Sequence, residues 1–252
     1  MPTYRISSRT EGDTQVEASN WMTALGEGFA LGKIPEMDRV ACEVLPNGKI
    51  LVRDLRSGTG YVVMPLDGAE DTEDLETIED EDLGGVPYDD IHPATLLDEL
   101  DEILSAVTEE GVIRRTLEAA HARVPAESGS VVLRRPDDRL AFALVTGSAQ
   151  AALENVTLPA DTGIVGFCVR RSIAVSVRDA YADPRFFREA DRMTGFETRS
   201  VLCVPIDFGG RVFGCLELLN AERGTGFERD DMVTLGAIAH AAGQRLAASA
   251  GR

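Results

Sequence analysis

The middle of the chain contains a long segment without basic residues, and this segment limits how the chain can fold. No Lys or Arg occurs between Arg56 and Arg114, whereas residues 67–110 hold 18 of the 43 acidic residues. These acids account for the whole net charge of −18, because the remaining Asp and Glu residues equal the 25 Lys and Arg residues in number. A self-repelling stretch of this kind favours an extended connection over a packed core. The sequence therefore predicts two folded domains, at residues 1–66 and 94–252, and an acidic linker between them, at residues 67–93.

The location of the charge bears on the partners that the chain could have. An acidic segment repels phosphate groups, and no basic stripe elsewhere offsets it, so we expect no nucleic-acid binding. We interpret the segment as a solvated linker, with an acidic docking site for a basic protein as the alternative. No apolar run approaches the ~20 residues that span a bilayer, and the first residues lack the pattern of an export signal. We therefore expect a soluble, cytoplasmic protein that does not bind membranes.

Cysteine and histidine residues show no pattern of a metal or catalytic site. The cysteines lie singly in apolar segments without paired spacing, which favours reduced thiols in a core over disulfides or zinc ligands. The histidines are far apart in the sequence and have no ligand spacing. We expect no metal, no required cofactor and no enzymatic activity. The residues concerned are Cys42, Cys168, Cys203 and Cys215, and His92, His121 and His240.

Residues 1–66 have the pattern of a small domain. Apolar residues recur at helical spacing from Val16 to Phe29, and Gly32 is placed to end the helix. A short strand at Tyr4–Ser7 precedes the helix, and up to three alternating segments with turn residues between them follow it. The sequence therefore predicts a β-α-β-β-β order, which by itself indicates no function.

The second domain combines long helical patterns with paired strands. We expect helices at 94–107, 109–124, 162–172 and 228–248, hairpins at 129–146 and 199–220, and a strand at 173–177. Residues 179–198 have turn signals and aromatic residues but weak periodicity, which predicts a long irregular crossover. This order favours an α+β fold, with one antiparallel sheet that has helices against one side and the crossover on the other. The gap under the crossover is the expected ligand site.

One carboxylate stands out in the last hairpin, RSVLCVPIDFGGRVFGCLELLN, which turns at Phe208-Gly209-Gly210. Because strand side chains alternate, Glu217 is expected to face the same side as Phe213, Cys215 and Leu219. A carboxylate among apolar neighbours is costly to bury unless something hydrogen-bonds it. The partner is either a ligand with N–H or O–H groups, or the protein and its solvent, for example Arg199 or water.

Five segments in order resemble a GAF domain, most closely the cyclic-nucleotide-binding GAF domains of phosphodiesterases and adenylyl cyclases. They read TLPADTGIVGFCV, DAYADPRFF, TGFETRSVLCVPI, GRVFGCLELLN and FERDD. The resemblance covers residues 105–248 and does not extend to residues 1–66. It implies a domain that binds a small molecule under the crossover and passes a conformational change to helices at its ends.

The resemblance also implies which residues hold the ligand. A cyclic nucleotide would contact Ser130, Thr146, the backbone amides of Ile164 and Val165, Thr194, Thr198 and Glu217. Amide groups at the start of the helix after Thr162 would suit a phosphate. Members that read guanine have an acid where this chain has Thr146, so cyclic AMP is favoured over cyclic GMP as the possible ligand.

A sequence signature of the family is incomplete in this chain. Asn220, Phe227 and Asp231 are in place, but Ala221 replaces a lysine and Met232 a glutamate. The missing lysine implies the loss of a salt bridge to Asp231 that would fix the last loop.

The predicted function is that of a signalling protein whose GAF-like domain senses a small molecule. The chain ends at Arg252, shortly after the last predicted helix, so we expect the output to pass through residues 1–66 or a partner protein. Apolar stripes on helices 94–107 and 228–248 favour a homodimer, although they could equally pack on their own sheet. The alternative is an adaptor with an empty pocket that binds other proteins through its surface.

Overall fold

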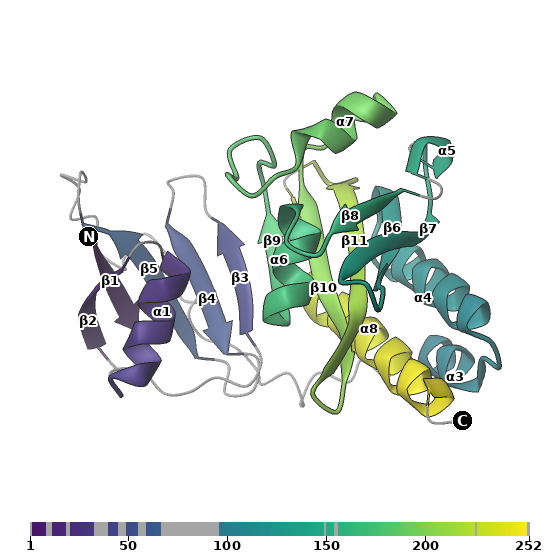
Figure 1. The fold of residues 1–252 in the computed structure, drawn as a ribbon, viewed down its shortest axis with the longest axis horizontal. Coiled ribbons are helices and arrows are strands. Elements are labelled where there is room, and N and C mark those ends of the chain that lie inside the picture. The colour runs from purple at the N-terminus through teal and green to yellow at the C-terminus, as the bar shows by residue number, and fades with distance from the viewer. Residues whose placement is uncertain are drawn as a thin grey trace. The chain divides into compact units, whose positions relative to one another are not determined.

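The described part of the chain forms two compact units. A computed structural model describes residues 2–8, 12–18, 21–32, 40–44, 49–54, 59–66, 96–148, 150–153, 156–224 and 226–250. The units are Met1–Ile91 and His92–Arg252, here called the N-terminal and C-terminal units (Figure 1). The expected acidic linker at 67–93 lies outside the described residues.

The N-terminal unit is a β-rich segment with one described helix. Its elements are β1 (Thr3–Ser8), β2 (Gly12–Glu17), α1 (Trp21–Ala30), β3 (Val40–Val44), β4 (Ile50–Asp54) and β5 (Gly60–Pro65). The strands lie in the order β2-β1-β5-β4-β3, and the pairs among them are antiparallel. The sheet buries Ile6, Leu51, Val52, Tyr61, Val62 and Val63.

Strand β2 corrects the predicted order of this unit, which becomes β-β-α-β-β-β. Val16, expected at the start of the helical pattern, instead pairs with Tyr4 in β2 and is buried. The strand was missed because Val16 is its only large apolar residue. An edge strand with so many polar residues has too little alternation in its sequence to be recognised.

The C-terminal unit contains a twisted antiparallel sheet. Its strands are β6 (Ala126–Arg134), β7 (Arg139–Val145), β8 (Thr157–Pro159), β9 (Ile173–Val177), β10 (Val201–Phe208) and β11 (Arg211–Ala221), in the order β9-β10-β11-β6-β7-β8. Gly209 and Gly210 both have positive φ angles, of 60° and 77°, which two-residue hairpin turns require. The predicted hairpins are confirmed, and β8 is a short edge strand that the sequence did not indicate.

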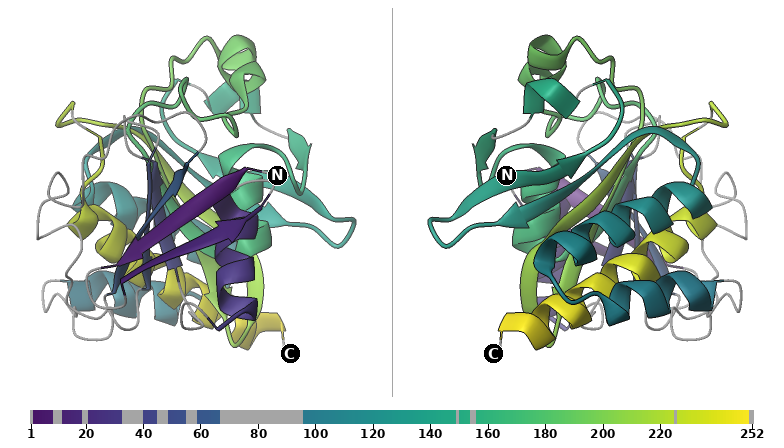
Figure 2. Two further views of the ribbon diagram at one scale, coloured as in Figure 1. Left: turned by 90° about the vertical axis from the view of Figure 1, so that its left-hand side faces the viewer. Right: turned by 90° about the vertical axis from the view of Figure 1, so that its right-hand side faces the viewer.

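Three helices cover one face of this sheet: α3 (Leu97–Ser105), α4 (Glu109–Arg123) and α8 (Arg229–Ala250), as Figure 2 shows. The apolar face of α8 is buried as expected. Close packing depends on Gly243, because a Cβ atom there would lie 2.3 Å from the Asp207 carbonyl oxygen of β10. On α3 only part of the predicted apolar stripe is buried: Ile103 is buried, whereas Leu97 and Leu104 are exposed.

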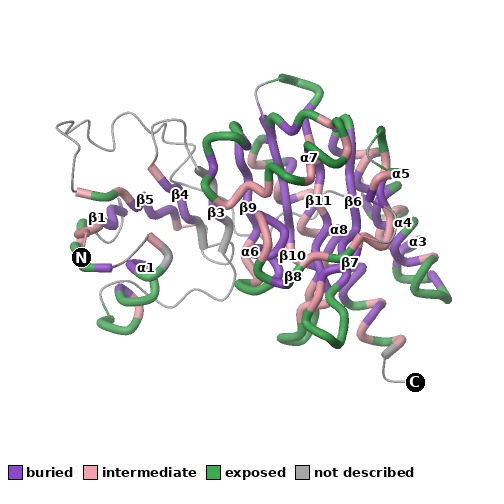
Figure 3. The backbone as a smooth tube through the Cα atoms, turned by 45° about the horizontal axis from the view of Figure 1, so that its top comes forward, coloured by how far each residue is buried: buried purple, intermediate pink, exposed green. Residues whose placement is uncertain are grey.

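The opposite face carries α6 (Gly163–Arg171), the short α5 (Gln150–Leu153) and the crossover, residues 179–198. The crossover is not irregular throughout, because it contains α7 (Arg188–Thr194), which ends at Gly195 in the left-handed conformation, φ 69°. A helix of seven residues shows fewer than two turns of periodicity, which explains why the sequence did not reveal it. Buried residues concentrate on β6, β10 and β11 between the two layers (Figure 3).

The four cysteines are buried thiols outside disulfides, as predicted. Burial raises the pKa of Cys168 and of Cys203 well above the usual value, so both stay protonated and unreactive at neutral pH. Within the described ranges, no three His, Cys, Asp or Glu side chains form a group that could hold a metal ion. No helix in the same ranges has the length and apolar character needed to cross a membrane.

Candidate ligand-binding site

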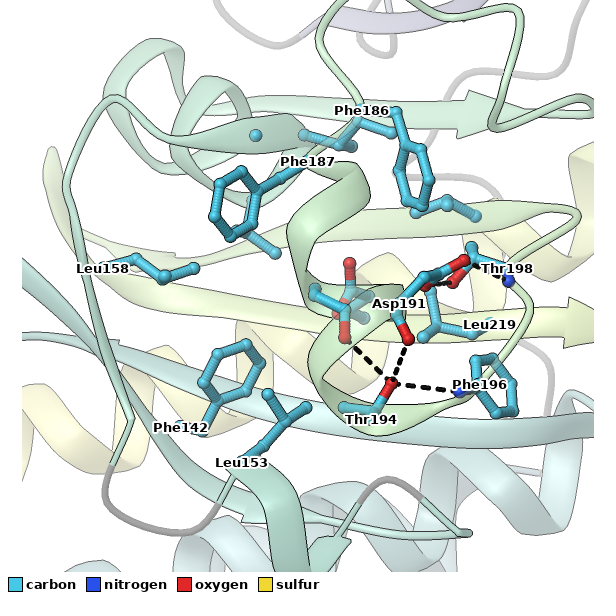
Figure 4. A pocket seen from close by; sticks show the side chains of 16 residues that line it. Phe142, Leu153, Leu158, Phe186, Phe187, Asp191, Thr194, Phe196, Thr198 and Leu219 are labelled. Atoms are coloured by element: carbon cyan, nitrogen blue, oxygen red, sulfur yellow. Dashed lines mark hydrogen bonds between the residues drawn. The ribbon is translucent and has the colours of Figure 1, made fainter.

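A pocket lies between the sheet, α6 and the crossover of the C-terminal unit. It contains about 570 Å³ of space between the atoms, a volume that includes the part open to solvent. Its walls are mainly apolar and come from β7, β8, α6, the crossover and β11 (Figure 4). The aromatic side chains among them are Phe142, Phe186, Phe187 and Phe196. The expected hollow under the crossover is therefore present.

Asp191 holds the roof of the pocket in place. It lies in α7, is buried, and accepts hydrogen bonds from the amide and hydroxyl of Thr198 at 2.8 and 2.7 Å. Tyr181 at the start of the crossover donates its hydroxyl to the same carboxylate at 3.0 Å. One side chain thus joins both ends of the crossover. Asp191 was not predicted as a site residue, since nothing in the sequence separates it from the other acids of this segment.

Thr194 and Thr198 both line the pocket, as the resemblance implied. Thr194 Oγ1 donates to the Ala190 carbonyl oxygen at 2.9 Å and accepts from the Phe196 amide at 3.1 Å. These bonds end α7 and turn the chain toward β10. Both hydroxyls are engaged within the protein, so a ligand would have to share or replace these contacts.

Glu217 lies on the floor of the pocket, on β11. In register it is opposite Ser130 of β6 and Cys203 of β10. Ser130 Oγ donates to Glu217 Oε2 at 3.1 Å. Burial raises the pKa of Glu217 to about 8, and the charges of Cys215 and, to a smaller extent, Asp191 act in the same direction. At neutral pH this carboxyl group is therefore mostly protonated.

The protein partner considered for Glu217 is engaged elsewhere. Arg199 forms an ion pair with Glu127 at the surface. In the part of the chain that the structure describes, Glu217 makes no ion pair, so Ser130 and the pocket remain as its polar surroundings.

The alternation of β11 is interrupted by a bulge. The pairing of β10 with β11 shifts between Ile206 and Asp207, so that Asp207 pairs with Val212. As a result Val212, rather than Phe213, packs with Cys215 in the core next to the pocket. The prediction that Phe213 faces the same way as Glu217 was therefore wrong, because an extra residue in one strand reverses the alternation beyond it.

The start of α6 borders the pocket through Ile164 and Val165. Thr162 caps the helix without a side-chain hydrogen bond, and Gly163 adopts a φ angle of 73°. The first amides of a helix have no partner within it and can bind an anion. Gly166 also serves packing, because a Cβ atom there would lie 2.7 Å from the Asp161 carbonyl carbon.

Two of the implied site residues are not among those that line the pocket. Ser130 reaches it through Glu217. Thr146 bonds instead to α4 and β6: its Oγ1 lies 2.7 Å from His121 Nε2 and accepts from the Gly129 amide at 2.9 Å. The structure therefore gives Thr146 a role in attaching α4 to the sheet. Burial lowers the pKa of His121, which keeps this contact uncharged.

Asn220 fastens the end of the crossover to the sheet. It is buried with a φ angle of 59°, and its Oδ1 accepts from the amides of Arg199 and Ser200 at 2.6 and 3.2 Å. Its Nδ2 donates to Glu127 Oε2 at 2.9 Å and to the Glu197 carbonyl oxygen at 2.8 Å. Every polar atom of the Asn220 side chain is thus used to fix the backbone beside the pocket.

The other signature residues close the loop before α8. Phe227 is buried, and Asp231 accepts from the Glu228 amide at 2.9 Å. The salt bridge thought to be lost with the lysine is present with a different partner, since Arg223 contacts Asp231 at 3.0 Å. An arginine two residues after Ala221 therefore replaces the missing lysine.

Comparisons with known proteins agree with this geometry. The GAF domain family matches residues 99–246. Over 83 residues the chain is 32% identical to the cGMP-specific 3',5'-cyclic phosphodiesterase of Drosophila sechellia, and over 78 residues it is 37% identical to the dual 3',5'-cyclic-AMP and -GMP phosphodiesterase 11A of Takifugu rubripes. These alignments cover 32% and 30% of this chain but 7% and 9% of the phosphodiesterases, so the chain spans under a tenth of their length.

Solved structures show the same fold. The GAF domain of a phosphoenolpyruvate-protein phosphotransferase from Coxiella burnetii aligns with a TM-score of 0.55 and 17% identity, over 62% of this chain and 95% of that one. The free methionine-R-sulfoxide reductase of Neisseria meningitidis aligns with a TM-score of 0.52 and 20% identity, over 66% and 91%. At such identities the likeness concerns the fold alone. Because the family match covers more than half of the chain and the fold agrees with it, the chain belongs to the GAF domain family.

Proposed function

We propose that the C-terminal unit is a sensor that binds a small molecule in the pocket under the crossover. The observation that carries the proposal is the pocket itself, which combines apolar walls with the polar groups of Asp191, Thr194, Thr198 and Glu217. Ligand contacts with Asp191 would compete with the bonds that hold the roof. Binding would thereby alter the crossover and the sheet beneath it, and the output would pass to residues 1–66 or to a partner protein rather than to a catalytic step of this chain.

A cyclic nucleotide is the first candidate ligand. The phosphodiesterases that the chain resembles are named for cyclic nucleotides, which supports this class. The amides at the start of α6 suit a single negative charge, and the four phenylalanines suit a planar base. We propose cyclic AMP rather than cyclic GMP, because guanine-reading members carry an acid where this chain has Thr146, and Thr146 is engaged with His121 and Gly129 and does not line the pocket.

A thermal-shift titration of the full chain tests the proposal. A ligand at a hundredfold excess over its dissociation constant should stabilise the chain by about 2.7 kcal/mol. We would titrate cyclic AMP, cyclic GMP and a panel of metabolites. Glu217→Ala should abolish the response and leave the chain folded, whereas Glu118→Ala, which removes an exposed carboxylate on α4, should not change it.

One outcome would contradict the sensor, and a second would contradict the role given to Glu217. If no compound stabilises a folded sample, the adaptor function with an empty pocket is favoured instead. If Glu217→Ala unfolds the chain, the residue is structural and does not report on binding.

We further propose that the chain forms a homodimer through α3 and α8. Leu97 and Leu104 lie on one face of α3 and are 56% and 36% exposed. Burying a leucine contributes about 1.5 kcal/mol or more, so Leu97→Gln with Leu104→Gln should weaken dimerisation at least tenfold. Light scattering at micromolar concentration should show the mass fall from two chains to one. A pair of Met substitutions at the same positions is the control, and a wild-type mass of one chain would exclude the dimer.

A further inference from the structure

The pocket contains two carboxyl groups and no basic side chain. Glu217 lies on β11 of the sheet and Asp191 on α7 in the roof, and none of the sixteen lining residues is Lys, Arg or His. Arg185 of the crossover is committed to other contacts: it is paired with Asp183 and lies over the Phe167 ring, 4.6 Å from its centre. A ligand is therefore recognised without a cationic side chain in the pocket.

The two carboxyl groups have different surroundings. Asp191 accepts three hydrogen bonds, two from Thr198 and one from Tyr181, which satisfy a charged carboxylate. Glu217 accepts one, from the Ser130 hydroxyl. With one donor and no counter-ion among the described residues, the charged form of Glu217 is poorly stabilised in the apolar pocket.

The other groups that face Glu217 supply no positive charge that would stabilise its ionised form. On the sheet and α6 they are Cys168, Cys203 and Cys215, none of which can carry a positive charge. Hydrogen bonds with Cys168 and Cys203 lower the pKa of Cys215, whose negative charge disfavours ionisation of Glu217. On the crossover they are the hydroxyls of Thr194 and Thr198 and the carboxylate of Asp191. Burial raises the pKa of Glu217 to about 8, and the negative charge of Cys215, followed by that of Asp191, acts in the same direction. A protonated carboxyl offers one O–H donor beside one carbonyl acceptor, whereas a carboxylate only accepts.

We propose that Glu217 recognises its ligand as a carboxylic acid, so that the pocket selects a planar ring whose edge carries an amino donor next to a ring-nitrogen acceptor, as in an aminopurine. This inference rests on the proposed function and specifies the ligand class of the same pocket. The adenine edge has this pattern, because its amino group donates and the adjacent ring nitrogen accepts. The corresponding guanine edge presents two adjacent donors, which complement a carboxylate. Loss of the proton from Glu217 therefore shifts the preference of the pocket from adenine toward guanine.

The aromatic lining of the pocket suits a flat ring. Phe142 lines it from β7, and Phe186, Phe187 and Phe196 line it from the crossover. Stacking of a base on an aromatic side chain contributes about 1–3 kcal/mol and does not discriminate between bases. Discrimination then depends on the hydrogen-bonding groups that meet the ring edge, of which Glu217 is the one that changes with pH.

Calorimetric titration of the full chain with cyclic AMP and cyclic GMP, from about pH 6 to about pH 8.5, tests the inference. The affinity for cyclic AMP should fall and that for cyclic GMP should rise, so that their ratio changes about tenfold or more over the range. Binding of cyclic AMP near the upper limit should take up a proton, which appears as a dependence of the heat on the buffer.

Glu217→Gln is the decisive variant, because an amide keeps the donor and acceptor of the protonated carboxyl and has no proton to lose. Its preference for cyclic AMP should be constant over the pH range. A constant ratio in the wild type, with binding present, would overturn the inference and leave the proposed function intact. A ratio that still changes with pH in Glu217→Gln would also overturn it, since another group would then be titrating. Absence of binding by both nucleotides at every pH would overturn the inference together with the cyclic-nucleotide proposal.

Discussion

Asn220→Ala is expected to lower the free energy of unfolding of the C-terminal unit by about 4 kcal/mol. The substitution removes the acceptor of the Arg199 and Ser200 amides, and each buried donor left without a partner costs about 1–3 kcal/mol. The backbone adds to this cost, because Asn220 has a φ angle of 59° and alanine tolerates the left-handed region poorly, at about 1–2 kcal/mol. Urea unfolding followed by circular dichroism would measure the change.

Asn220→Gly separates these two contributions. Glycine adopts the left-handed region without strain, so this variant should lose only the hydrogen bonds and be about 1 kcal/mol more stable than Asn220→Ala. Hydrogen exchange at the amides of Arg199 and Ser200 should accelerate in both variants. A loss below about 1 kcal/mol for Asn220→Ala would show that these bonds are replaced by water at little cost.

Glu217→Gln should make the chain more stable than the wild type at alkaline pH. The pKa of Glu217 is raised from 4.5 to about 8 in the folded protein, mainly by burial. The folded protein therefore favours the neutral carboxyl group of Glu217. Its contribution to the free energy of unfolding is fully present below about pH 4.5 and is lost as the pH rises toward about 8. Each pKa unit corresponds to about 1.4 kcal/mol, so the loss is at most about 4–5 kcal/mol. Since glutamine cannot ionise, the variant avoids this loss.

The free energy of unfolding, measured from about pH 5 to about pH 9, provides the comparison. The wild-type curve should fall over this range by more than that of Glu217→Gln, and the two should differ most at the alkaline end. Glu118→Gln, at an exposed position on α4, should follow the wild type. Parallel curves for the wild type and Glu217→Gln would show that Glu217 is already ionised in the folded protein at neutral pH.

These two residues define complementary parts of the site. Asn220 fixes the chain where the crossover returns to β10, through bonds to the backbone on both sides of that junction. Glu217 supplies the polar group on the floor. Substitution of Asn220 should therefore affect stability at every pH, whereas substitution of Glu217 should affect it only where the carboxyl group would ionise.

Much of the fold follows from short-range patterns in the sequence. The hairpin at 199–220 is encoded by β-branched residues on either side of Gly209 and Gly210, and α8 by a long apolar stripe. Elements with little local signal were missed. Strand β2 has one large apolar residue, and α7 is shorter than two helical turns.

Some residues of the candidate site could likewise be predicted from the sequence, and others could not. The resemblance of five segments to the GAF family led to Thr194, Thr198 and Glu217, and all three line the pocket. It did not lead to Asp191, whose role depends on contacts with Thr198 and Tyr181 that form only when the crossover folds over the sheet.

The sequence alone determined the family, the two predicted folded parts and the strand that carries Glu217, because hydrophobic period, turn residues and motif order are local properties of the chain. Only the tertiary structure decided which side chains share the pocket, that Arg223 replaces the absent lysine beside Asp231, and that the bulge in β11 brings Val212 to the core in place of Phe213. Those outcomes depend on distances between residues far apart in the chain and on strand register, which no local pattern specifies.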